Sequence, residues 1–136
     1  MADNALISLH RAFNDRDEDA FWSLLAEDVV WHTPGGHPMA GTLRGRDAVW
    51  ERYVGRFWQS PAHIEDHGEL SHADHSIVAV LHEVVNDFGA GQVRFAGIEV
   101  ARVRDGQVAE RWEFEEDQAK VDSIITAAMD AAGRSG

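Results

Sequence analysis

The stretch that decides the fold reads AEDVVWHTPGGHPMAGTLRGRDAV and runs from residue 26 to residue 49. Residues Val29–Trp31 favour a strand, because β-branched and aromatic side chains suit the pleated surface of a sheet. Pro34 ends this strand, since proline has no N–H to donate to a neighbouring strand. The glycines that follow predict a loose crossing before another helix starts at Asp47. The stretch therefore predicts the end of one helix, a short strand, a loop and the start of another helix.

Hydrophobic periodicity predicts the helices and strands of the rest of the chain. Leu6, Leu9 and Phe13 lie at helical spacing and predict a first helix, and a shorter helix follows across residues 20–25. The apolar residues between positions 49 and 58 predict a third helix. The remaining predicted elements are strands at residues 63–70, 76–85, 92–104 and 107–114, and a closing helix whose apolar face holds Val121, Ile124, Ile125, Ala128 and Met129. This order predicts an α+β fold, with three to four helices packed on a curved and mostly antiparallel sheet.

Composition limits the class of protein. The 136 residues are enough for a buried core, and we expect one domain over residues 1–136. The formal net charge of −12 argues against binding to nucleic acid or to anionic membranes, which attract basic patches. The chain has no cysteine, no signal-peptide pattern at its start and no apolar run of about 20 residues that would span a bilayer. These features favour a soluble protein of the cytoplasm.

A two-residue turn at Asp105-Gly106 is the strongest hairpin signal in the chain. Counted onward without a break, this register places Glu113 on the same face as Ile98 and Val100. A carboxylate in apolar surroundings has its pKa raised by desolvation, as a general acid or base requires. The alternative is that Glu113 is an exposed residue of the sheet, paired with Arg111.

Two segments carry a family resemblance: the stretch quoted above and VRDGQVAERWEFEEDQAKVDSII, at residues 103–125. Together they resemble the SnoaL-like branch of the NTF2-like superfamily, which also contains ketosteroid isomerases, polyketide cyclases and limonene-epoxide hydrolases. The resemblance covers nearly the whole chain, and it implies a cone-shaped α+β fold whose curved sheet wraps a long helix and encloses an apolar pocket. It also implies a homodimer. It leaves the reaction open, because members of the superfamily perform unrelated chemistry.

The resemblance points to three candidate catalytic residues. His32 corresponds to the histidine that precedes Pro-Gly in the family's strand-end pattern. Glu113 corresponds to the acidic residue that follows Trp in the last strand, where cyclases and epoxide hydrolases place a working Asp. Arg111 stands where many relatives carry His. His82 lies in phase with the valines of a central strand, where relatives often place polar residues that line the pocket.

These residue types support proton transfer without a metal or a cofactor. We expect Glu113 to act as the base, His32 as its proton partner and His82 as a donor that orients or polarises the substrate. All three side chains should converge on one cavity, bounded by the third helix. Such a site suits an isomerase, cyclase or hydrolase acting on a small hydrophobic molecule with a carbonyl group or a ring. The residues predicted to contact this ligand are Trp31, Trp50, Tyr53, Val54, Phe57, Ile98, Val100 and Arg111.

Other functions are compatible with the same residues. The pocket can belong to a binding or dimerisation domain without catalysis, in which His32 caps a strand end and His82 is a satisfied core histidine. A metal site is disfavoured, because His63 and His67 lie four apart in a predicted strand and so about 13 Å from each other along the chain. We also expect a second copy of the chain to cover the apolar outer face of the sheet, since large bare apolar patches are rare on soluble monomers.

Overall fold

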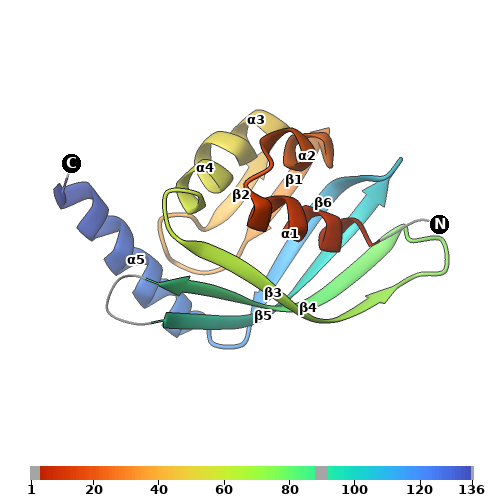
Figure 1. Cartoon of the computed structure of the whole chain (residues 1–136). Coiled ribbons are helices and arrows are strands. Elements are labelled where there is room, and N and C mark those ends of the chain that lie inside the picture. The colour runs from red at the N-terminus through yellow and green to blue at the C-terminus, as the bar shows by residue number, and fades with distance from the viewer. Residues whose placement is uncertain (1–3, 88–91, 136) are drawn as a thin grey trace.

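One mixed sheet organises the chain. Its strands are β1 (Leu25–Thr33), β2 (Gly41–Arg44), β3 (Ala62–Ser71), β4 (Ile77–Asp87), β5 (Gln92–Arg104) and β6 (Gln107–Glu115). The computed structural model describes residues 4–87 and 92–135, and in it the strands lie in the order β2-β1-β6-β5-β4-β3 (Figure 1). Strands β1 and β6 run parallel, and the other neighbouring pairs are antiparallel. The predicted α+β class with a mostly antiparallel sheet is confirmed.

Helices pack on one face of this sheet and at its end (Figure 1). They are α1 (Ala5–Asp15), α2 (Glu18–Ser23), α3 (Arg46–Val49), a π-helical turn (Trp50–Val54), α4 (Gly55–Phe57) and α5 (Gln118–Ser135). The predicted third helix is thus one helical run with a π turn in its middle, a feature that is frequent at functional sites. Figure 1 shows α1 to α4 on the same side of the sheet and α5 projecting away from its end. No described helix has the length and hydropathy that crossing a bilayer requires.

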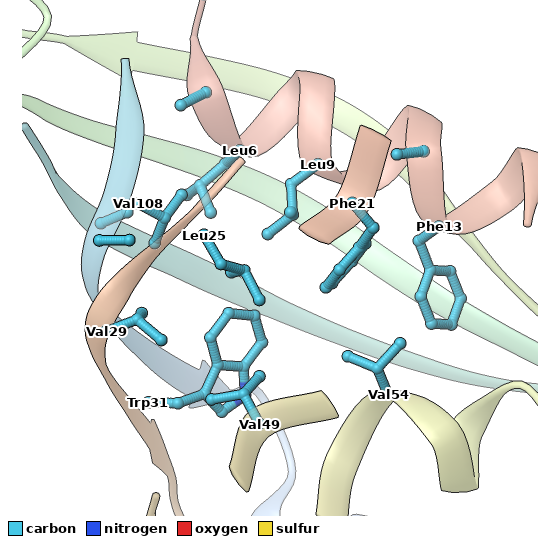
Figure 2. Close-up of a cluster of buried hydrophobic side chains, with 14 of the residues drawn as sticks. Leu6, Leu9, Phe13, Phe21, Leu25, Val29, Trp31, Val49, Val54 and Val108 are labelled. Carbon is cyan, nitrogen blue, oxygen red and sulfur yellow. The ribbon is translucent and has the colours of Figure 1, made fainter. Parts of the chain in front are cut away.

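The core lies between these helices and the inner face of the sheet, as Figure 2 shows. Leu6, Leu9 and Phe13, the predicted inner face of the first helix, are all buried. They meet Trp31 of β1 and Val54 of the π turn across this core. Each fully buried side chain of this size contributes about 1.5–3 kcal/mol.

The sequence predicts a loose loop around Gly41, but this segment forms β2. It pairs antiparallel with the end of β1, with Trp31 opposite Leu43. Gly41 and Gly45, at the two ends of β2, have φ values of 124° and 92°, which other residues rarely adopt. The glycines that suggest a loop therefore turn the chain into and out of a short edge strand.

The β5–β6 hairpin starts in the predicted register. Arg104 lies opposite Gln107, and Val103 lies opposite Val108. The next residue, Ala109, has no partner across the hairpin, and the register shifts there by one residue. The turn sequence does not reveal this bulge, which lies where the pairing of β6 with β1 is also irregular.

This bulge changes which side chains share a face with Glu113. Beyond it, Glu99 lies opposite Glu113 and Val100 opposite Trp112. Because successive side chains alternate between faces, Glu99 shares the inner face with Glu113, and Ile98 and Val100 lie on the outer face. Ile98 is 42% exposed, whereas Glu99 is 3% exposed. The prediction that Ile98 and Val100 lie beside Glu113 and contact its ligand is therefore wrong.

Candidate active site

A small cavity of about 40 Å³ lies between the helices and the inner face of the sheet. A cavity of this volume holds about three water molecules. Its charged lining residues are His10, His82, Glu99, Arg111 and Glu113. The rest of its wall is apolar or aromatic and consists of Leu9, Phe13, Phe21, Trp31, Tyr53, Val54, Phe57, Ile64 and Val84.

The charged residues form a row in which negative and positive groups alternate. We call this set the charged row; it runs Asp66, His10, Glu99, Arg111, Glu113, His82. At its first end, Nδ1 of His10 lies 2.6 Å from Oδ1 of Asp66, and Nε2 of His10 contacts Oε1 of Glu99. Helix α1 supplies His10, and the edge strand β3 supplies Asp66. The row therefore links a helix to the sheet through buried ion pairs.

Arg111 is the centre of the row. Its Nε donates to Oε2 of Glu99 at 2.6 Å, and its Nη2 donates to Oε2 of Glu113. Nη2 also lies 3.2 Å from the hydroxyl of Tyr53, and the guanidinium stacks 4.3 Å from the ring centroid of Trp31. Arg111 is 2% exposed, so the predicted pairing of Arg111 with Glu113 exists but is buried, not on the surface.

Gly97 allows the last two groups of the row to meet. His82 on β4 and Glu113 on β6 lie on either side of β5, where Gly97 is opposite His82. Nε2 of His82 lies 2.8 Å from Oε1 of Glu113. A Cβ atom at position 97 would lie 3.4 Å from that same Oε1 and 2.7 Å from the carbonyl oxygen of Phe114. The missing side chain thus leaves the space through which the imidazole and the carboxylate approach.

This end of the row has unused hydrogen-bonding capacity. Within the described residues, neither ring nitrogen of His82 nor Oε1 of Glu113 has a hydrogen-bond partner. The 2.8 Å contact between them lacks the angle that a hydrogen bond needs. Both residues line the cavity and are at most 6% exposed. These atoms have almost no exposed surface, so a ligand would reach them only as the cavity opens.

The charges at the other end of the row are fixed. Burial alone would lower the pKa of His10, but the carboxylates of Glu99 and Asp66 outweigh it and raise that pKa to about 10. Burial alone would raise the pKa of Glu99, but Arg111 and His10 hold it well below its usual range. His10 is therefore an imidazolium and Glu99 a carboxylate at neutral pH.

The pKa values of the groups around these unpaired atoms are shifted as well. Burial would lower the pKa of His82, but Glu113 and Glu99 outweigh it and raise that pKa. Burial raises the pKa of Tyr53, so its hydroxyl is neutral at physiological pH. Burial and the carboxylate of Glu113 raise the pKa of Glu115, at the end of β6, to about 8. The surroundings of Glu113 thus hold several protons at neutral pH.

The stability of the fold should depend on the proton of His10. Because the pKa of His10 is raised from 6.5 to about 10, its stabilisation is complete below pH 6.5 and is lost as the pH rises toward 10. Over that window we expect the free energy of unfolding to fall by about 1.4 kcal/mol per pH unit more in the wild type than in His10→Gln. Urea unfolding at several pH values measures this. His63→Gln, which changes an exposed histidine, should behave like the wild type. Equal slopes for wild type and His10→Gln would contradict the buried imidazolium.

The structure brings His82 and Glu113 together, as expected, but not His32. His32 lies on the outer face of the sheet, where its ring stacks on Trp112 with centroids 5.5 Å apart. Its Nε2 bonds Oε2 of Glu110 at 2.7 Å, and its Nδ1 bonds the hydroxyl of Thr42 at 2.9 Å. The neighbouring Trp31 faces the cavity, and alternation along β1 therefore turns His32 away from it. The expectation that His32 shares a cavity with Glu113 is wrong.

The predicted ligand-contacting residues divide in the same way. Those that line the cavity are Trp31, Tyr53, Val54, Phe57 and Arg111. Trp50 does not line it and packs edge-on against Phe21, Trp22 and Trp58, with centroids 5.3–6.1 Å apart. The third helix therefore borders the cavity with its π turn and α4, as predicted, but its first aromatic residue belongs to the core.

Three members of the charged row have no counterpart in the sequence-based prediction. His10 had a usable signal, because it lies at helical spacing from Leu6 and Phe13 and so on the inner face of α1. Glu99 is missed because an unbroken hairpin register places Glu113 on the opposite face, and only the bulge in β6 brings Glu113 to the face of Glu99. Asp66 gives no local signal, since it meets His10 from 56 positions away in the chain.

Three residues of the charged row could together serve as ligands of a metal ion. His82, Glu99 and Glu113 each offer one ligand atom within 4.8 Å of the others. However, Glu99 already binds both His10 and Arg111, and Glu113 also binds Arg111. Two resident cations compete with a metal for the same oxygens. The geometry therefore fits fixed ion pairs better than a metal site.

The family follows from a match over most of the chain. The sequence profile of the SnoaL-like domain matches residues 7–111. The chain belongs to the SnoaL-like family. The resemblance carried by the two quoted segments is thus confirmed. No curated protein sequence matches the chain.

Solved structures share the same SnoaL-like fold. Bal32a, from a soil-derived mobile gene cassette, has a TM-score of 0.79 and 24% identity and covers 88% of this chain and 92% of its own. TerC, co-crystallised with polyporic acid, has a TM-score of 0.75 and 18% identity. The match covers 89% of this chain and 95% of TerC. RV0760c from Mycobacterium tuberculosis, in complex with estradiol-17β-hemisuccinate, has a TM-score of 0.69 and 17% identity. The match covers 80% of this chain and 88% of RV0760c. At these identities the likeness shows the fold alone.

Proposed function

We propose that this SnoaL-like protein catalyses proton transfer on a small apolar molecule without a cofactor, and that Glu113 and His82 perform the chemistry. The supporting observation is the pair of unused groups at the cavity, Oε1 of Glu113 and the imidazole of His82, 2.8 Å apart. Buried polar atoms are normally paired, and leaving them unpaired costs stability. A ligand that uses these atoms accounts for their position in the wall of an otherwise apolar cavity.

Glu113 is the proposed base. Arg111 binds its Oε2, so Oε1, which has no hydrogen bond and lies 2.8 Å from Nε2 of His82, is the oxygen left to take the proton. His82, whose raised pKa favours the imidazolium, polarises a carbonyl oxygen or returns the proton. The neutral hydroxyl of Tyr53, beside Arg111, is a further donor. His82 thus takes the part of proton partner that the sequence suggests for His32.

The proposed substrate is a small, mostly apolar molecule with a carbonyl group or a ring, converted by an isomerase, cyclase or hydrolase type of reaction. The wall of the cavity outside the charged row is apolar or aromatic. The crystal complexes of TerC with polyporic acid and of RV0760c with an estradiol derivative support a ligand of this class. With about 40 Å³ of space, the cavity admits such a molecule only when an aromatic side chain such as Phe57 moves aside.

Proton exchange with solvent tests the reaction. We expect the wild type to accelerate deuterium incorporation next to the carbonyl of an apolar ring ketone, such as 1-tetralone in D₂O, because Glu113 removes that proton and solvent replaces it. Mass spectrometry follows the exchange against a buffer blank. A panel of apolar ring ketones that bind to the protein but exchange only at the rate of the blank would contradict catalysis.

The second candidate is a binding domain without catalysis. The buried ion pair between Arg111 and Glu113 favours it, because it gives the carboxylate a structural partner. In that case the unused atoms near the cavity only orient a ligand. Ligand affinity without exchange of ligand protons would identify this function.

We also propose a homodimer through the outer face of the sheet. Leu81, Ile98 and Phe114 lie there and are 44%, 42% and 55% exposed, an apolar patch that a second copy would cover. Sedimentation at micromolar concentration should give the mass of a dimer for the wild type and of a monomer for Phe114→Glu. Ser23→Glu, which adds the same charge on the exposed side of α2, should remain a dimer. A monomeric wild type would refute the proposal.

A further inference from the structure

A second, larger apolar site lies between α5 and the rest of the molecule. We call it the α5 groove; its volume is about 750 Å³. Its apolar wall includes Met39, Phe57, Phe95, Ile125, Ala128 and Met129. Figure 1 shows helix α5 projecting from the end of the sheet. Apolar residues of this helix form one side of the α5 groove. This volume is in the range of small-molecule sites.

The α5 groove is distinct from the cavity at the charged row. Phe57 is the one residue that both linings share among the described residues. The cavity at the charged row has about 40 Å³, which is too little for a ring compound without rearrangement. The α5 groove has the volume to admit one. Binding here therefore does not depend on Glu113 or on catalysis.

Asn86 gives the α5 groove a specific polar feature. It lines the α5 groove, is 3% exposed and has no hydrogen-bond partner for its Oδ1 among the described residues. Its Nδ2 donates to Oγ of Ser60 at 3.1 Å, and that Oγ donates to the carbonyl oxygen of Phe57 at 2.8 Å. Because the single proton of the Ser60 hydroxyl is used on Phe57, Ser60 must accept from the amide nitrogen. The chain of bonds thus sets the orientation of the amide and leaves an acceptor without a donor.

The other polar groups of the lining further limit the class of ligand. Arg56 is the one charged side chain among the described residues of the lining, and it is exposed. Among the described residues, the lining around Asn86 offers no buried charge that would favour an ion. An unpaired buried acceptor selects a partner with an O–H or N–H donor. We propose that the α5 groove binds a small, neutral, mostly apolar molecule whose hydroxyl group donates to Oδ1 of Asn86.

A pair of probes that differ in one donor tests this. We expect 2-naphthol to bind about tenfold more tightly than 2-methoxynaphthalene, because only the naphthol can donate to Asn86. A plain apolar surface would prefer the more apolar ether. Titration by fluorescence gives both affinities, and amide chemical shifts should place the bound naphthol against α5. The comparison within the wild type is decisive even if a variant fails to fold.

Variants locate the effect. Asn86→Leu removes the acceptor at similar size and should abolish the preference for the naphthol. Ala128→Trp fills the α5 groove and should weaken both probes, while Ala119→Trp, on an exposed position of α5 outside the lining, should weaken neither. Glu113→Gln should bind 2-naphthol like the wild type, so loss of the proposed catalysis would not affect this result.

Several outcomes would overturn the inference. They are equal or tighter binding of the ether, a preference that persists in Asn86→Leu, and shifts that map to the outer face of the sheet. A fourth is occupation of the α5 groove by α5 of a second copy, seen as a dimer that Ala128→Trp converts to a monomer.

Discussion

Replacing Arg111 with methionine should destabilise the fold by about 3–5 kcal/mol. The guanidinium binds Glu99 and Glu113 at once, and all three side chains are at most 6% exposed. Without it, two carboxylates remain buried at neighbouring positions with only imidazoles to balance them. Methionine fills a similar volume, so the loss reports on charge and not on an empty space. Urea unfolding at neutral pH measures the change in the free energy of unfolding.

A variant that removes all three charges is the matched control. Glu99→Gln, Arg111→Met and Glu113→Gln combined should be more stable than Arg111→Met alone, because breaking a buried ion pair costs more than replacing all of it. The stability of Arg111→Lys should lie between those of the wild type and Arg111→Met, since one ammonium cannot make the two carboxylate contacts together. A loss below about 1 kcal/mol for Arg111→Met would mean that water or protons compensate the carboxylates, as at an exposed pair.

Replacing Glu113 with glutamine should lower the exchange rate of an active ketone by roughly 10²–10⁴-fold, the usual worth of a positioned acid–base group. Glutamine has nearly the same shape and can still accept from Arg111, so the cavity should persist while the base is lost. Rates are compared per amount of folded protein, since the change also weakens a buried ion pair. Kinetics across a pH range separate the effect on the base from an effect on affinity.

Glu110→Gln is the control for this experiment. Glu110 lies three positions earlier on the same strand, but it pairs with His32 on the outer face. The exchange rate of Glu110→Gln should match that of the wild type. If Glu113→Gln also kept the wild-type rate while ligands still bound, Glu113 would be a structural partner of Arg111, and the binding-domain alternative would hold.

The sequence by itself determined most of the helices and strands, though not β2, and it determined the family. Leu6, Leu9 and Phe13 specify the buried face of α1, because side chains three and four apart lie on the same side of a helix. The Asp105-Gly106 turn specifies the start of the hairpin, because such a turn needs residues that accept positive φ, and both residues have it. These signals are local, so each can be read from a few neighbouring positions.

The tertiary structure alone decided which charged groups meet. One unpaired residue of β6, Ala109, turns Arg111 and Glu113 to the same face as Glu99, because side chains alternate along a strand and a shift of one residue exchanges the faces. His10 reaches Glu99 across 89 positions of sequence. His82 and Glu113 meet because Gly97, on the strand between them, has no side chain. Contacts of this kind depend on how strands pair and which helix covers them, and no local pattern of residues records that pairing.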